Sequence, residues 1–153
     1  MRTYADSSFI VKLISAEPDS DQVIAEYRRL GRPALFFLPI HTLEVRNAIL
    51  QRAFHERRST ANRQHIARVR DAALSRLNLL LSRGALLDVT HETDAAIALA
   101  AELAIVHTER LGVRAIDLLH VASARLLKCE RFLTTDVRQA ELARAEGLAV
   151  SPI

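Results

Sequence analysis

Four acidic residues, far apart in the chain, stand where predicted strands and helices meet. Asp6 ends the strand candidate "RTYAD", and Asp136 ends the strand candidate "RFLTT". Glu44 follows another short apolar run after a short loop, and Asp117 begins the helix that precedes the last of these strands. Sites in open α/β sheets form outside the carboxyl ends of the strands. We therefore expect the four carboxylates to converge on one end of a sheet.

Clustered carboxylates favour a cation, because like charges raise one another's pKa and desolvation adds to the cost. Oxygen ligands, without histidines and cysteines at zinc spacing, favour Mg²⁺ or Mn²⁺. Two such ions could activate water and stabilise the leaving oxygen in phosphodiester hydrolysis. The residues leave a second interpretation open, in which the acids are helix caps without chemistry.

Short strand candidates alternate with helical patterns along the whole chain. Apolar runs or alternation predict strands at 2–6, 34–38, 85–90, 131–135 and 148–150. Apolar spacing, capping residues and terminal glycines predict helices at 7–15, 20–31, 40–56, 61–82, 93–112, 115–126 and 137–147. Glu44 would then lie in the first turn of a helix that begins near His41 or Thr42. This alternation predicts an α/β/α sandwich, with a central, mostly parallel sheet and helices on both faces.

Length and composition limit the class of protein. A chain of 153 residues without repeats or linkers fits one domain over residues 1–153. The single cysteine, Cys129, excludes an internal disulfide and is expected to be a packed thiol. The longest apolar run, 95–106, is too short for a membrane span, and the first residues lack a signal-peptide pattern. We expect a soluble, cytoplasmic protein without a membrane partner.

Positive charge is concentrated in one quarter of the chain. Between residues 46 and 83 there are nine arginines against Glu56 and Asp71, a balance of 9 − 2 = +7, although the whole chain carries only +3. This asymmetry favours a surface for phosphate groups. Ordinary solvated faces of a helical hairpin explain it as well. The arginines that we expect to bind RNA are Arg46, Arg52, Arg57 and Arg58.

Three stretches resemble a known family. "YADSSFIVKLI" is similar to the opening of a PIN domain, and "LPIHTLEVRNAI" to the segment that carries its second acid. "RAIDLLHVASARLLKCERFLTTD" resembles the D-x-x-H-x-A-x-A helix and the strand with a T-x-D ending. Their order and spacing over nearly the whole chain resemble VapC-type toxins of bacterial toxin–antitoxin pairs.

The resemblance implies an endoribonuclease that uses Mg²⁺ or Mn²⁺, is restrained by a small antitoxin and forms a homodimer. It carries over Asp6, Glu44, Asp117 and Asp136 as catalytic, metal-binding acids. Ser8 and Thr134 are supporting hydroxyls in this interpretation, although they could also be a plain cap and a plain strand residue. His120 lies one turn after Asp117 and either contacts the site or is a partly buried structural histidine.

Two rival functions remain open. The first is a nuclease of the same fold that processes RNA without an antitoxin, and the second is a non-catalytic nucleic-acid-binding protein. A co-purifying partner would distinguish the toxin from the processing enzyme. RNA binding without cleavage, unaffected by a chelator, would indicate the non-catalytic protein.

Overall fold

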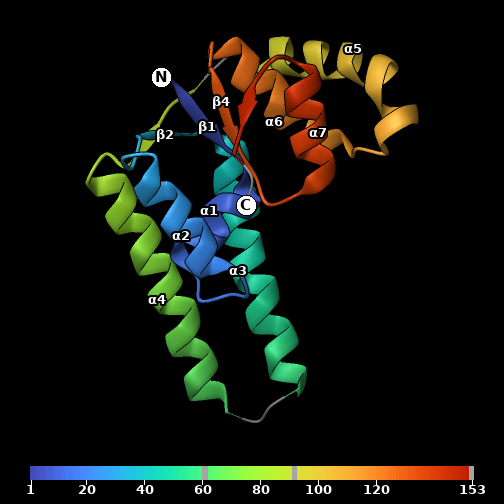
Figure 1. Cartoon of the computed structure of the whole chain (residues 1–153). Coiled ribbons are helices and arrows are strands. Elements are labelled where there is room, and N and C mark those ends of the chain that lie inside the picture. The colour runs from blue at the N-terminus through green and yellow to red at the C-terminus, as the bar shows by residue number, and fades with distance from the viewer. Residues whose placement is uncertain (60–61, 91–92, 152–153) are drawn as a thin grey trace.

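A five-stranded parallel sheet organises the structure, a computed structural model that describes residues 1–59, 62–90 and 93–151 (Figure 1). The strand order is β3-β2-β1-β4-β5, and every neighbouring pair is parallel. The strands are β1 (Thr3–Ala5), β2 (Leu35–Phe37), β3 (Leu86–Asp88), β4 (Arg131–Leu133) and β5 (Ala149–Val150). The helices are α1 (Ser7–Ile14), α2 (Ser20–Arg29), α3 (Pro39–Ser59), α4 (Arg63–Ser82), α5 (Thr93–Leu111), α6 (Ala115–Leu126) and α7 (Val137–Ala145).

Helices cover both faces of the sheet, as the α/β/α prediction requires. Along a strand, successive side chains point to opposite faces. Tyr4 and Phe132 are paired on neighbouring strands and pack into a core with α5, α6 and α7. Ala5 and Leu133, one residue further along, pack into the other core with α1 to α4. The predicted sandwich with a parallel sheet is therefore confirmed.

Helices α3 and α4 form a long hairpin that extends away from the sheet (Figure 1). Ile49 and Ala53 of α3, together with Ala73 and Leu77 of α4, are buried in the hairpin. The predicted start of the second helix at Ala61 lies outside the described residues, and α4 is described from Arg63. Within the described part of the chain, no helix has both the length and the apolar character needed to cross a membrane.

Several boundaries differ from the prediction near the acids. Helix α3 begins at Pro39 rather than at His41 or Thr42, so Glu44 lies beyond the first turn. Proline suits a first helical position because the amide hydrogen that it lacks has no partner there. Strand β4 ends at Leu133, and Asp136 caps α7 instead of ending the strand.

Cys129 is a free, buried thiol, as expected from the sequence. Burial raises the pKa of Cys129 to about 11. The neutral thiol is a poor nucleophile, because the thiolate is the reactive form. Cys129 therefore belongs to the packing of the α5–α7 side of the sheet.

Packing in the hairpin can be tested by two leucine truncations on α4. Leu77 is 1% exposed, whereas Leu79 is 45% exposed. Leu77→Ala should lower the free energy of unfolding by about 3 kcal/mol, because the removed atoms leave a cavity. Leu79→Ala should lower it by less than about 1 kcal/mol. Urea denaturation measures both values, and equal losses would contradict the packing described here.

Candidate active site at the carboxyl end of the sheet

Asp6 is a buried carboxylate at the end of β1. It is 3% exposed and caps α1 by accepting a hydrogen bond from the amide of Phe9 at 2.9 Å. The Ser8 hydroxyl lies 2.8 Å from both carboxylate oxygens, and the Thr134 hydroxyl donates to Oδ2 at 2.7 Å. Burial raises the pKa of Asp6, against the charge of His120 and these hydrogen bonds, which lower it. The hydrogen bonds and the charge of His120 therefore offset only part of the cost of burying the Asp6 carboxylate.

Thr134 and Gln139 connect Asp6 to the acids of α6 and α7. The Thr134 hydroxyl is 3.1 Å from the Gln139 side-chain oxygen and accepts a hydrogen bond from the amide of Asp136 at 3.0 Å. The Gln139 side-chain nitrogen donates to the carbonyl of Asp117 at 3.4 Å. The supporting hydroxyls predicted at Ser8 and Thr134 both contact Asp6.

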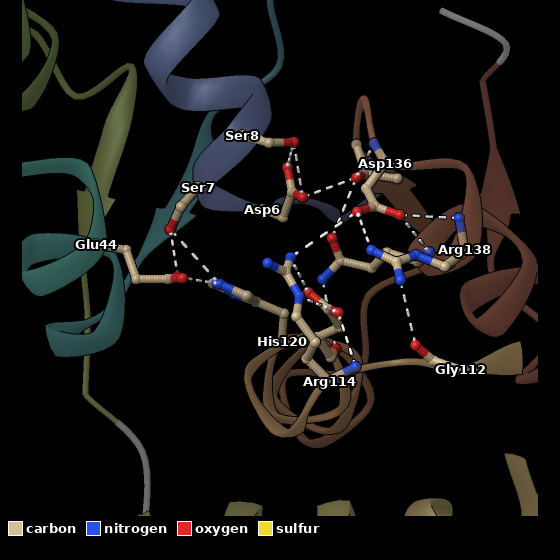
Figure 2. Close-up of polar contacts among 12 residues, drawn as sticks. Asp6, Ser7, Ser8, Glu44, Gly112, Arg114, His120, Asp136 and Arg138 are labelled. Carbon is tan, nitrogen blue, oxygen red and sulfur yellow. Dashed lines mark hydrogen bonds and ion pairs between the residues drawn. The ribbon is translucent and has the colours of Figure 1, made fainter. Parts of the chain in front are cut away.

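Glu44 lies on α3 and is held from two sides (Figure 2). The Ser7 hydroxyl donates to Glu44 Oε2 at 2.7 Å, and His120 Nε2 lies 2.6 Å from the same oxygen. Burial alone would raise the pKa of Glu44, but the hydrogen bond and charge of His120, the Ser7 hydroxyl and Arg114 together lower it. Glu44 is therefore a well-anchored carboxylate in its ionised form.

His120 bridges the sheet and Glu44. Its Nδ1 lies 2.8 Å from the Tyr4 hydroxyl, while Nε2 faces Glu44. Burial, followed by the charge of Asp6, raises the pKa of Tyr4 well above its ordinary value, so the phenol is neutral. Nε2 donates to the Glu44 carboxylate, which can only accept. His120 is 2% exposed and thus both buried and in contact with a predicted site residue.

Asp117 and Asp136 share a cation, Arg114. The Nε and Nη2 atoms of Arg114 each lie 3.0 Å from an oxygen of Asp117, and its backbone amide donates to Asp117 Oδ2 at 3.0 Å. Arg114 Nη2 also lies 3.9 Å from Asp136 Oδ2. The Arg114 side chain is 63% exposed, whereas that of Asp117 is 4% exposed. Arg114 is thus the internal counter-ion of a buried acid.

The structure brings the four predicted acids to one end of the sheet, and no hydrogen bond or ion pair joins them to the predicted RNA-binding arginines within the described residues. Asp6, Glu44 and Asp136 approach the same region as Arg114 (Figure 2). Arg52 forms an ion pair with Glu56, with Nε 2.9 Å from Oε1, and its Nη1 lies 3.6 Å from Glu17 Oε1. Arg46 is exposed on α3. Arg57 and Arg58 are in the last turn of α3, at the far end of the hairpin.

Sequence reasoning missed Arg114, Tyr4 and Gln139. The spacing of three residues between Arg114 and Asp117 was a usable signal, because such residues are neighbours on a helix. Tyr4 and Gln139 gave no such signal. Tyr4 meets His120 across 116 positions of the chain, and Gln139 reaches Thr134 by the turn into α7.

The donor set at this end fits a hard divalent cation in its chemistry. Four carboxylates supply oxygen ligands, and a cation would offset the uncompensated burial of Asp6. Among the residues that the structure describes, however, no group of three or more His, Cys, Asp and Glu side chains stands arranged to hold a metal ion. The carboxylates are bonded to protein donors instead, so an ion would have to replace some of these contacts.

Comparison with known proteins identifies the family. A family model described as "PIN domain" matches residues 3–145 of the chain. The comparison with curated proteins gave no significant match.

Solved structures support the same fold. The chain is similar to VapC20 of Mycobacterium tuberculosis, a sarcin–ricin loop cleaving toxin, at a TM-score of 0.68 and 16% identity, over 98% of this chain and 99% of the other. It is similar to FitAcB of Neisseria gonorrhoeae at a TM-score of 0.65 and 15% identity, over 98% and 96%. It is also similar to VapBC2 of Rickettsia felis, solved with a DNA fragment from the promoter. The TM-score is 0.61 and the identity is 15%, over 99% of this chain and 98% of the other.

The role of Arg114 as a counter-ion predicts a loss of stability on its removal. Arg114→Ala should lower the free energy of unfolding by about 1–2 kcal/mol, because Asp117 stays buried while losing two hydrogen bonds. The matched control is Arg70→Ala, which breaks the pair with the exposed Asp71 and should change little. Urea denaturation measures both variants, and equal stabilities would refute the counter-ion role.

His41 predicts an acid-dependent loss of stability. It is fully buried, and burial, followed by the charge of His120, lowers the pKa of His41 from 6.5 to about 3. Between these two pKa values, the His41 ring is protonated in the unfolded chain and neutral in the folded protein. The free energy of unfolding should therefore fall as the pH drops below about 6.5. At pH 5 the loss due to His41 should be about 2 kcal/mol.

Nuclear magnetic resonance can isolate this group. The ring signals of His41 should stay constant between pH 8 and pH 5 in the folded protein, and should titrate near 6.5 in the urea-unfolded chain. A midpoint above pH 5.5 in the folded protein would show that the ring is not held neutral.

Proposed function

The chain belongs to the PIN-domain family, and on that premise we propose that it is an endoribonuclease that hydrolyses RNA with the help of Mg²⁺ or Mn²⁺. Four acids from distant segments gather at one end of the sheet, where Asp6 is buried, Glu44 contacts His120, and Asp117 and Asp136 both approach Arg114, and this arrangement supports the proposal. If the acids were only helix caps, they would not need to lie at the same end of the sheet. Burial of Asp6 with a raised pKa is costly for a cap alone.

Each residue has a role in the proposed reaction. Asp6 and Asp117 would hold the ion, and Asp136 would be an outer ligand. When bound, a divalent ion supplies a Lewis acid and a source of hydroxide near neutral pH. Glu44 would be a further ligand or would orient the attacking water as a base, because His120 and Ser7 fix its carboxylate. Ser8 and Thr134 would keep Asp6 oriented.

Single-stranded or looped RNA is the substrate that we propose. Such chains are flexible enough to enter a cleft, and their bases are accessible. Arg46 and Arg57 make no ion pair with any residue that the structure describes, and Arg58 lies over the Phe54 ring. We propose that these three arginines bind phosphates outside the acidic centre. Arg52 would take part only after leaving Glu56.

We further propose that the protein is the toxin of a type II toxin–antitoxin pair, active in the cytoplasm as a homodimer and restrained by a small antitoxin. The similarity to VapC20, described as a cleaving toxin, supports this choice. The alternative is an RNA-processing nuclease that works without an antitoxin. Purification with and without the product of a neighbouring gene separates the two, because only a toxin is silenced by a dedicated partner.

Carboxylate-to-amide substitutions test the proposed chemistry. Asp6→Asn and Asp117→Asn should each lower the rate of RNA cleavage in Mn²⁺ at least about 100-fold, because they remove a charged ligand. Glu102→Gln is the control, since Glu102 is exposed in the middle of α5. A chelator should abolish cleavage by the parent protein.

The measurement is the cleavage of a fluorescent RNA mixture by purified variants whose folding is checked by thermal denaturation. Cleavage by both Asn variants at the parental rate would refute the site. Inactivity of the parent in Mg²⁺ and Mn²⁺ with intact RNA binding would favour the non-catalytic alternative.

A further inference from the structure

A cavity of about 670 Å³ lies between α2 and α7. Gln22, Glu26 and Arg29 of α2 line one side, and Val137 and Arg144 of α7 line the other. The connection from β4 to α7 closes one end of it. Its volume is in the range of pockets that hold small organic ligands.

The cavity adjoins the acidic site through shared residues. Thr134 lines the cavity and donates to Asp6 at 2.7 Å. Asp136 also lines it, and the same carboxylate lies 3.9 Å from Arg114. A chain whose phosphate lies at the acids can therefore place its next unit in the cavity without leaving the protein surface.

The cavity carries both positive and negative side chains, which suit a ligand with both an anionic group and a hydrogen-bond donor. Arg144 is exposed and makes no side-chain hydrogen bond or ion pair with a described residue. Glu26 is 11% exposed and is held by Arg29 through two hydrogen bonds of 2.6 and 2.7 Å. Hydrogen bonding from Arg29 is the largest influence on the pKa of Glu26 and lowers it, so the carboxylate is ionised. The cavity thus offers a cation that has no ion-pair partner among the described residues, and a fixed acceptor.

The rim of the cavity is apolar. Val137 is 73% exposed, although it is a large hydrophobic residue at the start of α7. Ala25 and Ala140 add small apolar surfaces on the two helices. A flat ring can lie against such a surface while its polar edge faces Glu26 and Gln22.

We propose that this cavity binds one nucleotide of the RNA, next to the phosphate that is cut. Arg144 contacts the phosphate of that nucleotide, Val137 contacts the face of its base, and Glu26 accepts a hydrogen bond from an amino group on the base edge. Carboxylates recognise the amino group of cytosine in this way. The inference rests on the proposed function, because it assumes that RNA is the substrate.

A charge reversal at a cavity residue and another at an exposed control residue test the proposal. Arg144→Glu should weaken the binding of a short single-stranded RNA about tenfold, measured by fluorescence anisotropy in a chelator so that no cleavage interferes. Lys128→Glu makes the same change of charge at an exposed position next to the amino end of β4, and should weaken binding less than twofold. Equal effects of the two variants would overturn the proposal.

Base selectivity provides a second readout. The parent should bind oligocytidine more tightly than oligouridine, and Glu26→Gln should reduce this preference, with folding checked by thermal denaturation. An unchanged preference would overturn the role of Glu26. Free cytidine monophosphate should bind far more weakly than the oligomer, and equal affinities would instead assign the cavity to free nucleotides.

The outcomes separate this inference from the proposed function. If the parent cuts RNA and Arg144→Glu binds RNA as the Lys128→Glu control does, only the cavity assignment fails. If Arg144→Glu weakens binding as expected but the parent cuts no RNA in Mn²⁺, the ribonuclease proposal fails and the cavity remains an RNA-binding site.

Discussion

Negative charge gathered at the carboxyl ends of parallel strands is the constraint on which the structure depends. The sheet order places β1 next to β4, so Asp6 and the β4–α7 connection meet. Asp6 and Asp117 are each 3% exposed. Buried carboxylates are costly unless a cation or hydrogen-bond donors compensate them. The neighbouring side chains at this end of the sheet supply the hydrogen bonds and the positive charge that offset this cost.

The protein compensates its acids by three separate means. Asp6 relies on hydroxyls and a helix amide, Glu44 on His120 and Ser7, and Asp117 on Arg114. Behind them, Tyr4 orders the His120 ring by a hydrogen bond of 2.8 Å, so the sheet itself fixes the orientation of a side chain at the site. Arg114 is mostly exposed, and we propose that it is the contact that a bound cation would replace first. The site therefore combines buried hydrogen bonds around Asp6 with a mostly exposed counter-ion at Asp117.

Local patterns predicted the strands and helices, because apolar runs and alternation report burial directly. They also predicted the end of the sheet at which Asp6, Glu44 and Asp136 meet, since parallel strands align their carboxyl ends. Two kinds of feature were beyond local patterns. The contact of His120 with Glu44 joins residues 76 positions apart, and the cavity between α2 and α7 arises from packing of distant helices. The start of α3 was misplaced because capping residues outweighed Pro39 in the prediction.

We propose that the carboxylates around Asp6 and Asp117 form a cation site once Arg114 leaves Asp117. Anomalous scattering from crystals grown with Mn²⁺ would locate the ion in this site. We expect a manganese peak coordinated by oxygens of Asp6 and Asp117, with the Arg114 guanidinium displaced from Asp117. A map with no peak there, and Arg114 still bound to Asp117 at saturating Mn²⁺, would contradict it.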